Sequence, residues 1–250
     1  RSNRLVDSAA KATTKSVCYH FSLSANHQLG RFITIEGLDG CGKSTQLNRL
    51  ARALSAIGAE PMITREPGGT VVGERIRALL LDSSTSGLFP WAELALMFAS
   101  RAQHLQEKIM PWLREGKYVL CDRYTDSSEA YQGGGRELGS APVLELHRIL
   151  CGNVQPNLTI LMDSDVSASV QRARQRNLDR IRQQTNAAGV KAVDENRFER
   201  ESRTFFERVR FQYLAIAQRE PERVYLVDAR RGPDAVFKEI LGEVKKRLGI

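Results

Sequence analysis

The sequence lacks long apolar runs, paired cysteines and internal repeats. No stretch approaches 18 consecutive apolar residues, so we expect no membrane partner and no helix that crosses a bilayer. The four cysteines form no C-x-x-C pair, which argues against a zinc site and favours reduced thiols in a cytoplasmic protein. An apolar fraction of 42% and a charged fraction of 26% are typical of a globular domain large enough to bury a core.

A general basic surface is also missing, although the net charge is +8. Residues 1–30 hold four basic residues and one acidic residue, residues 170–210 hold eleven and six, and the remaining residues balance at 22 each. This distribution argues against a nucleic-acid partner. The arginine-rich segment over residues 172–180 is either a phosphate clamp or a solvated helix face, and the charge pattern does not decide between the two.

The first 29 residues have the composition of an extension. Serine, threonine, alanine, lysine and asparagine dominate, and Asp7 is the only acid. The composition resembles a transit peptide, and upstream translated sequence, an added leader or part of a longer chain are further interpretations. We predict a disordered extension over residues 1–29 and one domain over residues 30–250.

Strand-like and helix-like patterns alternate through this domain. The predicted strands are Phe32–Glu36, Glu60–Arg65, Tyr118–Asp122, Leu158–Asp163 and Val224–Asp228. The predicted helices cover residues 43–56, 72–82, 91–115 with a kink at Pro111, 142–152, 167–182, 197–219 and 233–248. Such alternation predicts a three-layer α/β/α fold with a five-stranded parallel sheet, and ligands bind at the carboxyl ends of such strands.

A phosphate-binding loop follows the first predicted strand. Residues 37–44 read G-x-x-x-x-G-K-S between a β-prone run and an amphipathic helix. The predicted ATP-binding residues are Gly37, Leu38, Asp39, Gly40, Cys41, Gly42, Lys43, Ser44 and Thr45. Lys43 is expected to reach the β- and γ-phosphates, and the Ser44 hydroxyl to ligate Mg²⁺. The chain is therefore predicted to bind a nucleoside triphosphate.

Three further motifs narrow the chemistry. Residues 64–70 read T-R-E-P-G-G-T, residues 122–124 read D-R-Y, and residues 130–136 read A-Y-Q-G-G-G-R, while the Asn-Lys-x-Asp guanine reader of GTPases is absent. With the phosphate loop, these motifs closely resemble the thymidylate kinase family from about Gly30 to the C-terminus. The resemblance implies a P-loop kinase fold with a helical lid. It also implies transfer of the γ-phosphate of ATP to dTMP, giving dTDP and ADP in dTTP synthesis.

The resemblance places the acceptor phosphate between two arginines. Arg65 and Arg123 are expected to clamp the monophosphate of dTMP, because a planar guanidinium matches phosphate oxygens, although each could form a strand-end salt bridge instead. Asp122 is expected to support Mg²⁺ and to orient the reacting phosphates together with Lys43. Asp39 is expected near the 3′-hydroxyl of the dTMP sugar, where a carboxylate beside a triphosphate needs a donor partner.

The resemblance also implies a base pocket. Phe98 is expected to stack on thymine, Arg101 to donate to O4 of the base, and Ser128 to meet N3. Tyr131 is expected to crowd C2′ of the sugar, which favours deoxyribose, and Gln132 to line the same wall. Without the resemblance, an aromatic residue such as Phe98 on a helix has core packing as a serious alternative.

The catalytic positive charge is expected from a lid over about residues 170–198, as in the bacterial-type branch of the family. The variable positions of the phosphate loop carry no basic residue. The predicted catalytic lid arginines are Arg174, Arg176 and Arg180, with Arg172 beside them. Since Arg174 and Arg176 cannot share one helix face, we expect only a subset to reach the phosphates.

A polar insertion over residues 183–195 separates two partial matches to the family's lid motif. Either Arg180 or Arg197 could therefore occupy the family's arginine position. We expect the insertion to affect the rate of lid opening more than the chemistry.

A thymidylate kinase is the leading hypothesis, with Mg²⁺ and ATP as cofactor and donor and a homodimer implied by the resemblance alone. A kinase for another nucleoside monophosphate is the first alternative. The second is an ATP-binding switch or a nucleic-acid-associated ATPase. That reading predicts a distributed basic surface and an acid placed to activate water, and the sequence shows neither.

Overall fold

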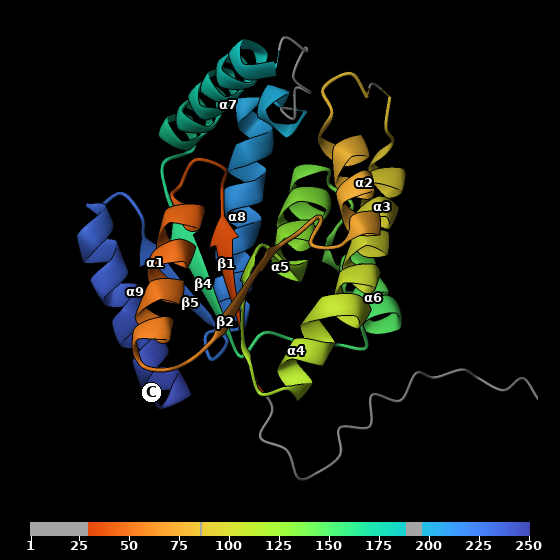
Figure 1. Cartoon of the computed structure of the whole chain (residues 1–250). Helices are drawn as coiled ribbons and strands as arrows, with labels where there is room; N and C mark the ends of the chain where they lie inside the picture. The colour runs from red at the N-terminus through yellow and green to blue at the C-terminus, as the bar shows by residue number, and fades with distance from the viewer. Residues whose placement is uncertain (1–29, 86, 189–196) are drawn as a thin grey trace, which may run out of the picture.

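The computed structural model describes residues 30–85, 87–188 and 197–250 (Figure 1). The predicted extension over residues 1–29 and residues 189–195 of the predicted insertion lie outside the described residues. Among the described helices, none combines the length and apolarity needed to cross a membrane.

A parallel sheet forms the centre of the molecule. Its strands are β1 (Arg31–Gly37), β2 (Pro61–Arg65), β3 (Tyr118–Asp122), β4 (Leu158–Asp163) and β5 (Val224–Asp228). They lie in the order β2-β3-β1-β4-β5, and every neighbouring pair is parallel. Each predicted strand is found within one residue of its expected ends. The predicted three-layer fold with a five-stranded parallel sheet is confirmed.

Helices cover both faces of this sheet (Figure 1). They are α1 (Lys43–Ala56), α2 (Val71–Leu81), α3 (Pro90–His104), α4 (Met110–Arg114), α5 (Thr125–Ser128), α6 (Ser140–Cys151), α7 (Val166–Ala188), α8 (Arg203–Arg219) and α9 (Pro233–Leu248). Helix α7 contains the first part of the segment predicted as a lid and runs six residues beyond the predicted end of the helix.

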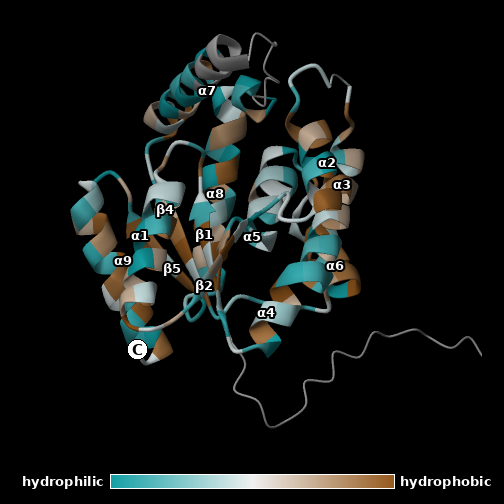
Figure 2. Cartoon of the chain, viewed as in Figure 1, coloured by the Kyte–Doolittle hydropathy of each residue, from teal (hydrophilic) through white to brown (hydrophobic). Residues whose placement is uncertain are grey.

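The alternation of side chains along β1 separates two apolar layers. Ile33 and Ile35 are fully buried against α1 and α9, whereas Phe32 faces α3, α4 and α6. A third cluster joins α8 to the start of α7. Hydrophobic and hydrophilic residues alternate along the helices that cover the sheet (Figure 2), as is typical of helices that bury one face.

Two predicted helices differ from the structure. The helix expected over residues 91–115 is interrupted by a π-helical turn at Leu105–Ile109, because Pro111 has no N–H and its ring crowds the preceding turn. The helix expected over residues 197–219 is a short 3₁₀ turn at Phe198–Arg200 followed by α8. The Ser202 side chain accepts from the Phe205 N–H and begins α8 there.

One helical region was not predicted. Residues 125–135 form α5 and then a π-helical turn at Glu129–Gly135. Three consecutive glycines argue against a helix on propensity alone. Packing of α8 against this turn overrides that preference. The packing is close enough to require glycine, because a Cβ on Gly135 would lie 2.5 Å from the Phe205 ring.

Candidate active site

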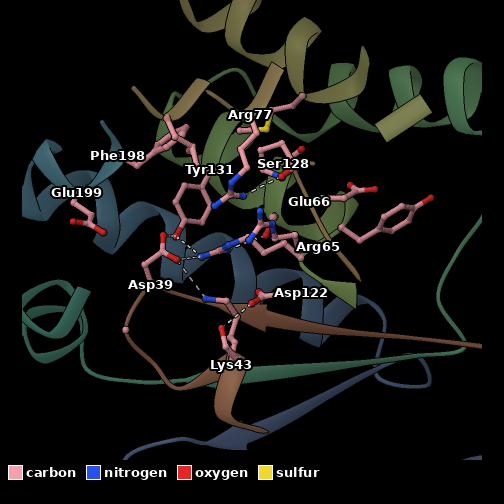
Figure 3. Close-up of a pocket in the computed structure, with 18 of the residues that line it drawn as sticks. Asp39, Lys43, Arg65, Glu66, Arg77, Asp122, Ser128, Tyr131, Phe198 and Glu199 are labelled. Atoms are coloured by element: carbon pink, nitrogen blue, oxygen red, sulfur yellow. Dashed lines mark hydrogen bonds and ion pairs between the residues drawn. The ribbon is translucent and has the colours of Figure 1, made fainter. Parts of the chain in front are cut away.

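A cavity of about 510 Å³ lies at the carboxyl ends of β1, β2 and β3 (Figure 3). Strand β1 lies between β3 and β4, so the strand order reverses at β1. Ligands bind beside such a switch point, at the carboxyl ends of the strands, in open α/β sheets. The predicted site residues that line the cavity are Asp39, Gly40, Gly42, Lys43, Ser44, Thr45, Arg65, Arg101, Asp122, Arg123, Ser128, Tyr131, Gln132 and Arg176.

The phosphate loop folds tightly around the Lys43 side chain. Lys43 is 6% exposed, and its Nζ donates to the carbonyls of Gly37 at 3.1 Å and Leu38 at 2.9 Å. Gly40 has a φ of +83°, and a Cβ there would lie 2.1 Å from the carbonyl oxygen of Ser169 on α7. The loop therefore holds Lys43 ready to exchange backbone carbonyls for phosphate oxygens.

Ser44 and Asp122 form an oxygen pair beside this loop. The Ser44 hydroxyl donates to Asp122 Oδ2 at 3.1 Å, which joins the first turn of α1 to the end of β3. Hydroxyl and carboxylate oxygens are ligands that Mg²⁺ prefers, and Mg²⁺ commonly uses one or two protein oxygens together with substrate phosphates. The donor set fits the predicted cation.

Arg123 provides the donor partner that Asp39 was expected to need. Its Nη2 donates to Asp39 Oδ1 at 2.7 Å, and its Nη1 donates to Ser127 Oγ at 2.9 Å and to the Tyr213 hydroxyl at 3.1 Å. Burial alone would raise the pKa of Asp39, but the charges of Arg123 and Lys43 outweigh burial and hold that pKa well below its usual range. Asp39 is therefore ionised, and it orients the guanidinium at the end of β3.

Backbone geometry also directs Arg123 into the cavity. Its φ of +74° lies in the left-handed region, which is uncommon for a residue other than glycine. Strained backbone of this kind persists where surrounding contacts hold it, often at functional sites.

Arg65 lines the same cavity, is 56% exposed, and pairs with Glu74 at 3.1 Å. The structure thus brings the two predicted guanidinium clamps into one cavity.

Arg101 is held from both sides at the bottom of the cavity. Its Nε donates to Glu66 Oε2 at 2.7 Å, and its Nη2 donates to Ser128 Oγ at 3.0 Å and to the Tyr124 carbonyl at 3.1 Å. His104 lies 3.0 Å from the other oxygen of Glu66 through Nδ1. The remaining nitrogen of Arg101, Nη1, is buried without a hydrogen-bond partner among the described residues.

Tyr131 and Gln132 lie on the π-helical turn and form one wall. The Tyr131 hydroxyl lies 3.4 Å from Asp39 Oδ2 and accepts from Arg123 Nη2 at 3.2 Å. Gln132 Nε2 donates to Glu93 Oε1 at 2.8 Å, whereas Gln132 Oε1 is buried without a partner among the described residues. Two of the described residues that line the cavity, Arg101 and Gln132, therefore each carry a buried polar atom without a hydrogen-bond partner.

Phe98 does not line the cavity in this structure. Its ring is fully buried in the cluster beneath α3, and the Arg101 guanidinium lies over it at 4.6 Å from the ring centroid. The neighbouring residue, Met97, lines the cavity instead. The stacking role predicted for Phe98 would require its ring to leave this cluster.

The arginines of the predicted lid make different contacts. Arg176 lines the cavity, and Arg172 Nε donates to the Gly40 carbonyl at 2.8 Å. Arg174 is not among the residues that line the cavity, and its Nε and Nη2 donate to the Glu199 carbonyl at 2.9 and 2.8 Å. The Arg180 side chain lies outside the described residues.

Arg197 is committed to contacts remote from the phosphate loop. Its Nη2 lies 2.8 Å from Glu93 Oε2, and its guanidinium lies over the Phe198 ring at 4.4 Å. These contacts attach the segment after the insertion to α3. These contacts argue against Arg197 as the family's lid arginine and leave Arg180 as the other candidate. The assignment of the lid arginine to Arg180 stays a prediction.

Several cavity residues were not assigned a role from the sequence. They are Glu66, Pro67, Arg77, Leu81, Met97, Tyr124, Ser127, Asn177, Phe198 and Glu199. Glu66 stands inside the T-R-E-P-G-G-T motif, and Phe198 and Glu199 belong to the partial lid motif after the insertion, so motif position was an available signal. Arg77 and Leu81 carry no such signal, because α2 is brought over the cavity by packing on α3.

A second cavity of about 480 Å³ lies on the other side of the phosphate loop. It is lined by Cys41, Gly42 and Thr45 of the loop region, by Arg172 of the lid, and by Arg230 and Arg231 after β5. The predicted loop residues Gly40, Gly42 and Thr45 line both cavities. The phosphate loop thus lies between the two cavities and lines both of them.

Comparisons with known proteins agree with this geometry. A family model described as thymidylate kinase matches residues 35–240. The thymidylate kinase of Desulforapulum autotrophicum is 44% identical over 219 residues, 88% of this chain and 92% of that protein. The thymidylate kinase of Geobacter sulfurreducens is 45% identical over 220 residues, 88% of this chain and 99% of that protein.

The fold is also similar to a solved structure. The crystal structure of thymidylate kinase from Ehrlichia chaffeensis matches with a TM-score of 0.67 and 29% sequence identity, over 86% of this chain and 98% of that one. The family model covers most of the chain, and the curated relatives are matched over most of their length. This chain therefore belongs to the thymidylate kinase family.

Proposed function

We propose that the first cavity transfers the γ-phosphate of ATP to dTMP, giving dTDP and ADP. The observation that carries the proposal is the meeting of donor and acceptor groups in one space. Lys43 and the Ser44–Asp122 pair face it from the phosphate loop and the end of β3, and the Arg65 and Arg123 guanidiniums line it from the ends of β2 and β3. A donor phosphate on the loop and an acceptor phosphate on the arginines would then be adjacent.

Positioning and charge neutralisation carry the chemistry. The acceptor is an ionised phosphate, so transfer needs no strong general base. Lys43 would exchange its backbone carbonyl partners for phosphate oxygens, and Arg176 would add positive charge from α7. Arg172 is fixed to the phosphate loop through the Gly40 carbonyl and would hold the lid close to it.

Mg²⁺ fits the Ser44 hydroxyl and the Asp122 carboxylate as described above. When bound with ATP it would supply charge neutralisation on the phosphates. The second cavity has room for the nucleoside of ATP, and Arg230 and Arg231, which pair with Asp228 and Glu239, line it.

The acceptor base would be read by the two buried atoms that lack partners. A thymine edge offers the O4 acceptor and the N3–H donor, which complement the free donor on Arg101 and the free acceptor on Gln132. Leaving such atoms unpaired is costly, and a site built this way rejects bases with the wrong edge. Tyr131 is held beside Asp39 and would restrict the space for a 2′-hydroxyl.

A homodimer is supported by apolar side chains on adjacent helices. Val72 and Leu79 on α2, Trp91 on α3, and Ile149 on α6 are all at least 45% exposed, and α3 packs against both α2 and α6 (Figure 2). An exposed apolar surface of this kind is typical of an interface. Light scattering coupled to size exclusion would give the mass, and a monomer at micromolar concentration would contradict this part of the proposal.

Coupled ADP production with Mg²⁺-ATP tests the reaction, with dTMP, dUMP, dCMP or dGMP as the acceptor. Strong preference for dTMP is expected. Equal rates with all four acceptors would keep the kinase and contradict the base-reading argument. ATP hydrolysis that is independent of any acceptor would contradict the phosphoryl transfer itself.

A further inference from the structure

Two adjacent residues of α3, Met97 and Phe98, point to different sides of the helix. Met97 is partly buried, lines the cavity, and packs against the cluster that contains Tyr131 and Phe198. Phe98 is fully buried in another cluster. Because Met97 lies four residues before Arg101, one helical turn separates them, and both side chains reach the same cavity.

Arg101 fixes where the edge of a ligand ring would lie. The side chain is 2% exposed, and Nε and Nη2 are fully used by Glu66, Ser128 and the Tyr124 carbonyl. Its Nη1 is the buried donor without a partner among the described residues. Met97 lies one helical turn earlier on α3 and lines the same cavity, so it is the apolar α3 side chain nearest in sequence that could meet the face of a base bound at Arg101.

We propose that Met97, in place of an aromatic ring, packs on the face of the acceptor base. The inference rests on the proposed function, since it names a further specificity residue of the same acceptor site. A thioether side chain is unbranched and polarizable, and its sulfur makes favourable contacts with aromatic rings. It adapts to the ring it meets, whereas a rigid aromatic side chain requires a set offset or edge geometry.

Phe98 has a different role in this arrangement. The Arg101 guanidinium lies over its ring at 4.6 Å, so the ring supports the guanidinium by a cation–π contact. Arg101 Nε contacts Glu66 Oε2 at 2.7 Å. To reach the cavity, the Phe98 ring would have to displace Arg101 from this contact. Phe98 therefore acts on the base through Arg101, and Met97 touches the base directly.

The test compares Met97→Ala and Met97→Phe with the unchanged full chain, and uses Phe98→Leu as a neighbouring control. Calorimetric titration gives the affinity for dTMP, and steady-state kinetics give KM for dTMP and for ATP. Met97→Ala should weaken dTMP binding by about tenfold, the upper range of a sulfur–ring contact with its apolar area, and should leave KM for ATP unchanged. Met97→Phe should restore most of the affinity, because a ring can also pack on the base.

Phe98→Leu should lower the melting temperature and weaken dTMP binding less than Met97→Ala does, since the residue lies in the core. Unchanged dTMP affinity in Met97→Ala, with normal dTMP turnover by the unchanged protein, overturns the assignment of Met97 alone. A larger loss in Phe98→Leu than in Met97→Ala also overturns it. Absence of dTMP-dependent ADP production by the unchanged protein overturns the proposed function, and this inference with it.

Discussion

Glu36 is a fully buried carboxyl group whose protonation should shape the pH dependence of stability. On β1, its Oε1 accepts from the Tyr124 N–H at 2.6 Å, and its Oε2 accepts from the Ser127 hydroxyl at 2.5 Å and the Tyr213 hydroxyl at 2.9 Å. Burial, followed by repulsion from Asp126, raises the pKa of Glu36 from 4.5 to about 7. Between about pH 4.5 and 7, Glu36 therefore keeps a proton in the folded protein that it has lost in the unfolded chain.

The direction of the effect follows from this difference in bound protons. Below pH 4.5 the carboxyl group is protonated in both states, and its stabilising contribution is fully present. Between pH 4.5 and 7 the unfolded chain has lost the proton and the folded protein keeps it, so the free energy of unfolding falls as pH rises. At about 1.4 kcal/mol for each pKa unit, the total loss from Glu36 is about 3 kcal/mol.

His147 acts in the opposite sense over nearly the same range. Burial, followed by the charge of Arg101, lowers the pKa of His147 from 6.5 to about 4. The unfolded chain then holds the extra proton, and stability rises with pH through this window. The two groups oppose each other in the unchanged protein, so its pH profile alone does not reveal Glu36.

The assay is urea unfolding of the unchanged protein and of Glu36→Gln at several pH values from 4.5 to 8. Glutamine keeps an oxygen for the Tyr124 N–H and has no proton to lose. His147 contributes equally to both proteins. The free energy of unfolding of the unchanged protein minus that of the variant should therefore fall by about 3 kcal/mol from pH 4.5 to 8. A difference that stays constant, or that rises with pH, would refute the reasoning.

Three further substitutions test the cavity and its support. Lys43→Ala should lower kcat by roughly 10²–10³, the cost of removing one preorganised donor, and a loss under tenfold in steady-state assays would contradict its role. Asp122→Asn should raise the Mg²⁺ concentration for half-maximal activity by about 10–100-fold, and a Mg²⁺ titration at saturating ATP that matches the unchanged protein would contradict the assignment. Glu93→Ala should lower the free energy of unfolding by about 3–5 kcal/mol in urea, because the fully buried carboxylate pairs with two arginines. The exposed pair partner Glu137 is the control, and Glu137→Ala should cost less than about 1 kcal/mol.

Local sequence patterns were sufficient for the sheet and the phosphate loop. Strand β3 was predicted with its observed ends, because its apolar run is bounded by Gly116–Lys117 and by charged residues. The loop at residues 37–44 was equally predictable, since the glycines and Lys43 carry their roles within eight residues. In both cases the forces that form the structure act between residues that are close in the chain.

The helices around the cavity were less predictable because distant contacts set them. The π-helical turn over residues 129–135 contradicts glycine propensity and forms where α8 packs against it. Glu93 carries no chemical motif, yet Gln132, Arg136 and Arg197 reach its carboxylate from two later segments. Contacts across about 40 or more positions leave no local signal in one sequence.

The resemblance to thymidylate kinases placed the right motifs at this cavity, whereas packing selected which neighbouring side chain faces it. On α3 the pattern allows either Met97 or Phe98 to face the ligand, because each lies about one turn before Arg101. Burial of the larger apolar ring against β1 and α6 turns Phe98 inward and leaves Met97 at the cavity wall. The choice depends on the apolar area that the assembled layers remove from water, and that area exists only once the sheet and its helices have come together.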